Sequence, residues 1–258
     1  MPSDAPHQGE PSYVLRVGTV VRETADTVSV SLEVPDHLRA ALTFRPGQFL
    51  TVAVPSLETG LVARAYSLSS SPLETDRMTF SVKWTPDGYA SKWLHDNVEA
   101  GDQLRVLRPS GIFSPRSLDA DLLMYAAGSG ITPMMSIIRT VLAPIDAGGG
   151  AGRMALFYAN RDRASVVFAA ELDRLAAAHP GRLVVEHWLE EERGLPTGEA
   201  IREHAAAYLD RDSFCCGPKP FMDVVAAELR ALGFPRERRH QERFVSLGGN
   251  PFGTAQPL

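Results

Sequence analysis

One short apolar segment carries a cation, an aromatic ring and a hydroxyl in close succession. It reads Arg-Ala-Tyr-Ser-Leu-Ser-Ser from Arg64 to Ser70. Because side chains alternate across a β-strand, Arg64 and Tyr66 would share a face, where the guanidinium could hold a phosphate and the phenol ring could cover a flat heterocycle. Ser67 would give a hydrogen bond at the polar edge of that ring. The segment predicts a flavin site, and the alternative is an amphipathic strand with an exposed arginine and tyrosine.

A second candidate site lies at the start of a helical pattern from Tyr89 to Leu94. The first backbone N–H groups of a helix have no acceptor within it, and the helix dipole makes this end positive. Ser91 in the first turn and Lys83 on the preceding strand add to a predicted anion site. The alternative is a helix that only closes a barrel, beside a solvated lysine.

A glycine turn follows the apolar run that ends at Ala126. It reads Gly-Ser-Gly from Gly128 to Gly130, before a helix that starts at about Thr132. Glycines permit a tight turn and the close approach of a diphosphate, and Pro133 suits the first helical position, where no N–H is needed. Pro133 also replaces the third glycine of the dinucleotide fingerprint G-x-G-x-x-G. The turn predicts a cofactor contact, and the alternative is a plain strand-to-helix connection.

A late turn places a thiol beside a glycine, in the run Cys-Gly-Pro from Cys216 to Pro218. The polarisable thiol would lie at the carboxyl end of a strand, where the glycine lets a flat ligand approach. A small buried residue that ends a core strand explains Cys215 but not Cys216. The two cysteines are sequence neighbours, too close for an ordinary disulfide, so we expect free thiols. They also cannot supply the four thiolates of a plant-type iron–sulfur centre.

The elements that must position these residues change character near Ser117. The earlier part has short alternating runs with Pro and Gly turns, which predict an antiparallel Greek-key β-barrel. Its expected strands lie within residues 13–34, 49–55, 61–69, 78–84 and 103–108. The later part alternates apolar runs with helical patterns in βαβ order, which predicts a parallel sheet with ligand crevices at the carboxyl ends of its strands. Its expected strands are 122–126, 154–159, 183–188, 214–216 and 241–244, and its helices 132–142, 165–178, 199–209 and 220–232.

Composition bounds the class of protein. The 258 residues are 44% hydrophobic and 22% charged, which is ordinary for a globular chain of two domains. A net charge of −5 gives no electrostatic reason to expect nucleic acid or an anionic membrane as a partner. No apolar run approaches the roughly 20 residues that cross a bilayer, and Met1 to Pro11 lacks a signal-peptide pattern. We expect a cytoplasmic protein.

Three of these motifs in this order, Arg-x-Tyr-Ser, Gly-x-Gly-Ile-Thr-Pro and Cys-Gly-Pro-x-x-Phe, resemble the ferredoxin reductase superfamily. In that superfamily a barrel binds flavin and an α/β domain binds a nicotinamide dinucleotide. The resemblance covers nearly all of Ser12 to Phe252. Runs that begin at Phe44, Asp87, Tyr158 and Glu242 look like the reductase component of 3-ketosteroid 9α-hydroxylase. In that group a plant-type ferredoxin domain follows, whereas this sequence stops at Leu258 and has no cluster ligands.

The resemblance implies domains and site residues. The expected parts are a flexible tail (1–11), an FAD-binding barrel (12–115), an NAD(P)H-binding α/β domain (116–245) and a linker-like tail (246–258). The implied FAD contacts are Arg64 on the pyrophosphate, Tyr66 on the isoalloxazine, and Ala65, Ser67, Val82, Lys83, Trp84, Gly88, Tyr89, Ala90, Ser91, Thr132 and Phe244. The implied NAD(P)H contacts are Gly128, Gly130, Asn160, Arg161, Cys216, Gly217, Pro218 and Phe221. Around the reacting rings the implied residues are Cys216, Thr132, Ser67 and Glu242, and no metal is expected.

The implied activity is hydride transfer from NADH to FAD, followed by release of single electrons. The implied acceptor is a ferredoxin domain or a separate iron–sulfur protein that serves a terminal oxygenase, with a steroid as one candidate substrate. The loop Asn160-Arg161-Asp162-Arg163 offers an acid for a ribose diol and arginines for a 2′-phosphate, so it leaves NADPH open, and the resemblance favours NADH. The alternatives are a reductase of free flavin or quinone, and a non-catalytic nucleotide-binding subunit.

Overall fold

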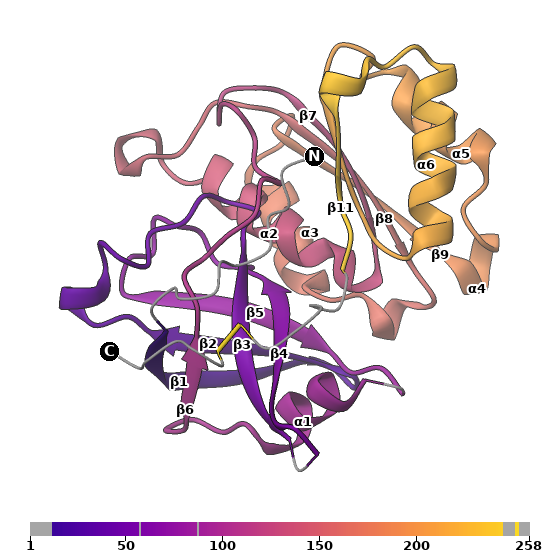
Figure 1. Ribbon diagram of the computed structural model, residues 1–258. Coiled ribbons are helices and arrows are strands. Elements are labelled where there is room, and N and C mark those ends of the chain that lie inside the picture. The colour runs from indigo at the N-terminus through magenta and orange to yellow at the C-terminus, as the bar shows by residue number, and fades with distance from the viewer. Residues whose placement is uncertain (1–11, 57, 87, 245–250, 253–258) are drawn as a thin grey trace. The chain divides into compact units, whose positions relative to one another are not determined.

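The computed structural model describes residues 12–56, 58–86, 88–244 and 251–252 (Figure 1). Contacts within the chain divide it into two units, Met1–Ser114 with Phe244–Leu258, and Pro115–Arg243. We call them the barrel unit and the α/β unit.

Both predicted tails fall mostly outside this description. Residues 1–11 lie outside the described residues, as do 246–250 and 253–258. Phe252, within the segment predicted to be linker-like, is buried against Ala53, Ala63 and Leu107 of the barrel unit.

The barrel unit is a six-stranded antiparallel sheet with one α-helix. Its elements are β1 (Tyr13–Thr24), β2 (Thr27–Glu33), β3 (Phe49–Ser56), β4 (Gly60–Ser67), β5 (Arg77–Lys83), α1 (Tyr89–Asn97) and β6 (Gln103–Val106). The strand order is β4-β3-β6-β1-β2-β5, so β6 inserts between β1 and β3 in Greek-key fashion. A bridge from Leu68 to Phe80 of β5 joins the two edges of the sheet. The predicted Greek-key barrel is confirmed.

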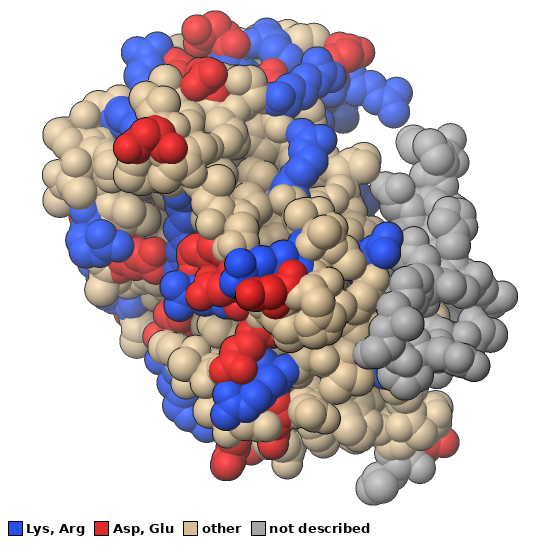
Figure 2. All heavy atoms as spheres, turned by 90° about the vertical axis from the view of Figure 1, so that its left-hand side faces the viewer, with Lys and Arg blue, Asp and Glu red and all other residues tan. Residues whose placement is uncertain are grey.

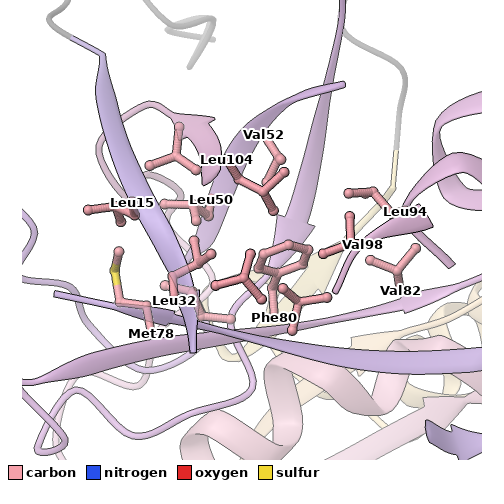
Figure 3. Close-up of a cluster of buried hydrophobic side chains, with 14 of the residues drawn as sticks. Leu15, Leu32, Leu50, Val52, Met78, Phe80, Val82, Leu94, Val98 and Leu104 are labelled. Atoms are coloured by element: carbon pink, nitrogen blue, oxygen red, sulfur yellow. The ribbon is translucent and has the colours of Figure 1, made fainter. Parts of the chain in front are cut away.

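Alternating apolar residues of these strands fill the barrel interior. Figure 3 shows Met78, Phe80 and Val82 of β5 pointing into one cluster with side chains of the other strands and of α1. All three are less than 2% exposed. Full burial of one such side chain contributes about 1.5–3 kcal/mol, so this cluster is a main source of the stability of the barrel.

The α/β unit is a five-stranded, all-parallel sheet in the order β11-β10-β7-β8-β9. Its strands are β7 (Leu122–Ala127), β8 (Met154–Asn160), β9 (Leu183–Leu189), β10 (Asp212–Cys216) and β11 (Arg239–Glu242). Its α-helices are α2 (Ile131–Val141), α3 (Ala169–Ala178), α4 (Glu190–Arg193), α5 (Gly198–Ala206) and α6 (Lys219–Ala231). Every residue of β7 and β8 is buried, because helices cover both faces of the sheet (Figure 1). The predicted βαβ order is confirmed.

Some element boundaries differ from the sequence-based expectation. The helix expected over 165–178 begins only at Ala169, because Asp162 and Ser165 form a capping box around a short 3-10 helix and Phe168 has a φ of 62°. The last strand is 239–242 rather than 241–244. These shifts move helix and strand ends by a few residues and leave the topology as expected.

Charged side chains of both signs are intermixed over the face drawn in Figure 2. Among the described residues, no helix combines the length and the apolar character that a membrane span needs.

Candidate functional site

On β4, Arg64 and Tyr66 lie on one face of the barrel sheet, as predicted, opposite Val52 and Leu50 of β3. Tyr66 is half-buried, and its ring stacks on Phe80 with a centroid distance of 5.6 Å and an interplanar angle of 24°. Burial raises the pKa of Tyr66, so the phenol stays protonated at neutral pH. Phe80, on β5, supports the Tyr66 ring. This contact depends on strand register, so local sequence spacing could not reveal it.

The Arg64 side chain stays close to its own strand. Its Nη1 donates to the Ala63 carbonyl at 2.8 Å, which uses one of five guanidinium N–H groups. Arg64 is half-buried, so the remaining donors can serve a phosphate at the surface of β4. Ser67, at the end of the strand, is 4% exposed.

Lys83 is not the free cation that the sequence suggested. Its Nζ lies 3.3 Å from Asp26 Oδ2, which β2–β5 pairing brings near because Thr27 is opposite Lys83. The side chains of Val82 and Ala90 are in the barrel core, so these two residues can offer a cofactor only backbone atoms. Trp84 is 37% exposed, with Lys92 Nζ 5.6 Å from its ring centroid.

Helix α1 begins with an uncapped end beside β3. Gly88 occupies the N-cap position and makes no side-chain cap. Ser91 donates its hydroxyl to the Gly88 carbonyl at 2.9 Å, so its backbone N–H, not its hydroxyl, remains for an anion. The Tyr89 hydroxyl donates to Pro55 of β3 at 2.8 Å, and its ring is 50% exposed. The start of α1 is thus tied to the β3–β4 pair, which also carries Arg64.

The carboxyl ends of the parallel strands gather a second set of predicted residues. Register places Cys216 of β10 between Ala126 of β7 and Glu242 of β11. Cys216 is fully buried, and burial raises the pKa of its thiol well above the ordinary value, with Cys215 and Glu242 raising it further. The thiol is therefore neutral and no thiolate nucleophile, and a ligand reaches it only when the groups that cover it move aside.

The two glycines predicted to admit a diphosphate have different roles. A Cβ on Gly130 would collide with the backbone of Cys216 and Gly217, so this glycine lets two turns pack against each other. Gly128 has a φ of 53° with open space where a Cβ would be. Only Gly128 leaves room at the edge of the sheet.

Gly217 and Thr132 also serve the packing of these turns. A Cβ on Gly217 would come within 2.9 Å of the Ala127 Cβ and 3.1 Å of Phe221. Thr132 is buried and donates its hydroxyl to the Ser129 carbonyl at 2.7 Å. Pro218 is the N-cap residue of α6 and is exposed.

Asn160 carries the most specific sign of a ligand at this edge. It ends β8 with 7% of its surface exposed. Neither amide atom makes a hydrogen bond of good geometry with a described residue, and the hydroxyl of the neighbouring Tyr158 donates to Gly128 instead. Leaving a buried polar group unpaired costs about 1–3 kcal/mol, which a ligand with a donor and an acceptor would recover. Asn160 therefore fits a bound dinucleotide.

Both arginines after Asn160 are paired with carboxylates. Arg161 Nε donates to Asp162 Oδ2 at 2.8 Å, and Arg163 Nη2 lies 3.0 Å from Asp173 Oδ2. The hydrogen bond from Arg161, and then that from the Ser165 N–H, lower the pKa of Asp162. The positive charges of these two arginines are thus nearly balanced by the two carboxylates.

Phe244 lies beyond the last strand, with its ring 51% exposed.

Comparisons with known proteins agree with this division into two sites. The family model of the oxidoreductase FAD-binding domain matches residues 15–114, and that of the oxidoreductase NAD-binding domain matches residues 124–227. The ferredoxin reductase component of 3-ketosteroid-9-alpha-monooxygenase from Rhodococcus rhodochrous is 50% identical over 255 residues, which are 99% of this chain and 71% of the relative. The chain belongs to the ferredoxin reductase family. This reductase is a flavin-dependent oxidoreductase that transfers electrons from NADH through FAD to an acceptor.

Other similar proteins share this arrangement. The corresponding component of Mycolicibacterium smegmatis is 51% identical to this reductase over 243 residues, covering 93% of this chain and 67% of the relative. Among solved structures, the Amycolatopsis cytochrome P450 reductase matches with a TM-score of 0.74 and 25% identity, over 94% of this chain and 73% of that one. The FAD/NAD-binding domain of nitric oxide dioxygenase from Vibrio cholerae matches with a TM-score of 0.70 and 26% identity, over 92% and 99%.

Proposed function

We propose that this reductase passes single electrons to an iron–sulfur partner, a ferredoxin domain or a separate protein, that serves a terminal oxygenase acting on a steroid. The observation that carries this proposal is the 50% identity, over 99% of the chain, to a ferredoxin reductase component of a ketosteroid monooxygenase. In the part of the chain that the structure describes, no group of three or more His, Cys, Asp or Glu residues is arranged to hold a metal ion. In this proposal the partner brings the iron–sulfur centre.

We further propose that the barrel unit holds FAD through β4 and the start of α1. The Arg64 guanidinium would pair with the diphosphate, and the Tyr66 ring, backed by Phe80, would lie against the isoalloxazine. Backbone N–H groups in the first turn of α1 would hold a phosphate oxygen. When bound, FAD supplies the hydride acceptor and the conversion of an electron pair into single electrons.

The α/β unit would hold NADH at the carboxyl edge of its sheet. The Asn160 amide would donate to and accept from the dinucleotide, and the open side of Gly128 would let the diphosphate approach. Cys216 would contact the nicotinamide as a neutral thiol, next to Glu242. The role of these residues is to orient the reacting carbon, since good positioning removes roughly 7–11 kcal/mol of barrier.

Anaerobic spectroscopy tests the proposed electron path. The purified protein should be yellow after dialysis, and NADH should bleach it. Addition of a separate plant-type ferredoxin should then restore the yellow colour as the ferredoxin is reduced. Bleaching without transfer to ferredoxin, but with transfer to added flavin or quinone, would instead support a reductase of free flavin or quinone. A protein that never bleaches would be a non-catalytic nucleotide-binding subunit.

Replacing Cys216 with alanine should slow NADH-dependent flavin reduction about tenfold or more, because nicotinamide loses one positioning contact. The FAD content should stay unchanged, since FAD is held by the barrel unit. Stopped-flow absorbance of the fully loaded protein measures both quantities. Because burial keeps the thiol protonated, the parental rate should not follow a thiol titration between about pH 6 and 9.

The matched control is Cys215→Ala, which removes the neighbouring buried thiol from the opposite face of β10. That variant should reduce its flavin within about twofold of the parental rate. Equal rates for Cys216→Ala and the parent would exclude the proposed contact.

Asp162 should help to exclude NADPH, because its carboxylate balances Arg161. Asp162→Asn keeps an acceptor for the Ser165 N–H but frees the arginine charge for a 2′-phosphate. We expect kcat/KM for NADPH to rise about three- to tenfold, with little change for NADH. The control Asp146→Asn removes the same charge from an exposed 3-10 helix elsewhere in the α/β unit. Equal gains in both variants would mean that Asp162 has no specific role.

A further inference from the structure

A cavity of about 310 Å³ lies in the α/β unit between helix α6 and strands β10 and β11. Figure 1 shows α6 beside β11 along the edge of the sheet. Val225 and Leu229 of α6 form an apolar wall of the cavity, and Ser213 and Arg239 of the strands form part of the opposite wall. Its size is at the lower end of ordinary small-molecule sites.

The cavity is separate from the carboxyl edge where we place NADH. Ser213 pairs with Arg239 in register, three residues before the pair Cys216 and Glu242. Three residues span about 10 Å along a strand, and residues at odd spacing point to opposite faces. Ser213 and Arg239 therefore project toward α6, away from Cys216 and Glu242.

The cavity is strongly cationic. Arg230, Arg236 and Arg239 all line it, and none of them has an ion pair with a described residue. Elsewhere in the same unit eight arginines pair with carboxylates. Among the acids beside the lining, Asp212 lies 3.3 Å from His240, and Glu228 pairs with Arg202 outside the lining. Three unbalanced guanidinium groups at one cavity favour a ligand with more than one negative charge.

Two buried donors in the lining lack partners among the described residues. Ser213 is 1% exposed, and its hydroxyl has no hydrogen bond. Arg239 Nε is likewise buried without an acceptor. Buried donors of this kind are rare in folded proteins because each carries an uncompensated desolvation cost. An oxyanion in the cavity would accept from both.

We propose that this cavity binds a phosphate monoester, with the dianionic phosphate held by Arg236, Arg239 and the Ser213 hydroxyl. Arginine presents two parallel N–H groups to a phosphate, which suits this head group. Val225 and Leu229 would cover its apolar organic part. The ligand class differs from the dinucleotide of the reductase reaction, and no step of that reaction uses the site.

Titration calorimetry with phenyl phosphate tests the proposal on the FAD-loaded protein at saturating NAD⁺, which keeps the dinucleotide site occupied. We expect one binding event per chain, and no binding of phenol, which lacks the phosphate. Arg236→Gln and Arg239→Gln should each weaken the affinity about tenfold or more. The control Arg174→Gln, which removes an exposed arginine from α3, should change the affinity less than twofold.

Ser213→Ala separates a binding role from a structural one. Loss of an unpaired buried hydroxyl should leave the thermal midpoint unchanged or higher, while phenyl phosphate binds several-fold more weakly. Three outcomes would each overturn the proposal. The first is the absence of binding heat, and the second is binding that occurs without NAD⁺ but is lost at saturating NAD⁺. The third is equal affinity in the parent and in Arg236→Gln and Arg239→Gln. If the arginine variants unfold, the Ser213→Ala result decides alone.

Discussion

Replacing Arg64 with alanine is expected to weaken FAD binding about 10- to 100-fold. Hydrogen bonds to charged groups contribute about 1.5–3 kcal/mol, and Arg64 is the half-buried cation on the face that also presents Tyr66. The barrel should stay folded, because the Arg64 side chain makes a hydrogen bond only to its neighbour Ala63 among the described residues. Fluorescence titration of the apoprotein with FAD measures the change directly.

Two further variants make this result specific. Arg64→Lys keeps the charge but loses the two-pronged geometry, so its affinity should fall between those of the parent and Arg64→Ala. Arg16→Ala removes an exposed arginine of β1, which pairs with Glu33 at 2.6 Å, and should bind FAD like the parent. Unchanged FAD affinity in Arg64→Ala would remove this residue from the proposed site.

Gly130→Ala is expected to destabilise the α/β unit by about 3 kcal/mol or more. The added methyl group would meet the backbone of Cys216 and Gly217, which cannot move aside as a flexible side chain can. The turns after β7 and β10 would separate, so NADH-dependent bleaching should also fail in the protein that remains folded. Denaturant unfolding followed by circular dichroism gives the loss of stability.

Gly128→Ala is the matched control two residues away. Its Cβ would enter open space, and only the left-handed φ of 53° opposes it, at a cost of about 1–2 kcal/mol. Comparing the stability lost in Gly130→Ala with that lost in Gly128→Ala therefore tests the packing of the two turns. A smaller loss for Gly130→Ala than for Gly128→Ala would contradict the packing described for these turns.

Local patterns in the sequence predicted the two architectures well. Short alternating runs placed strands within residues 13–34, where β1 and β2 lie, and the α/β unit follows the predicted strand and helix order. These predictions succeed because side-chain periodicity and turn residues act over short stretches of chain. The shared face of Arg64 and Tyr66 also follows from strand alternation alone.

Contacts between distant segments could not be predicted in this way. The sequence offered Lys83 as a free cation, but strand register pairs it with Asp26. The sequence also offered Arg163 for a 2′-phosphate. In the structure, Asp173 of helix α3 pairs with Arg163 and balances its charge. Each correction depends on a carboxylate that the fold brings close, and sequence spacing contains no sign of it.

The two-part architecture and the residue types at each predicted site can be recognised from local patterns in the chain. Which of these residues a ligand can reach depends on the folded arrangement. In the folded chain, Gly130 serves backbone packing and Gly128 stays open. The amide of Asn160 is buried without a hydrogen bond, and Ser213 and Arg239 lie together at a cationic cavity. The reason is physical: availability depends on burial, register and charge balance, and each of these is set by residues far apart in the chain.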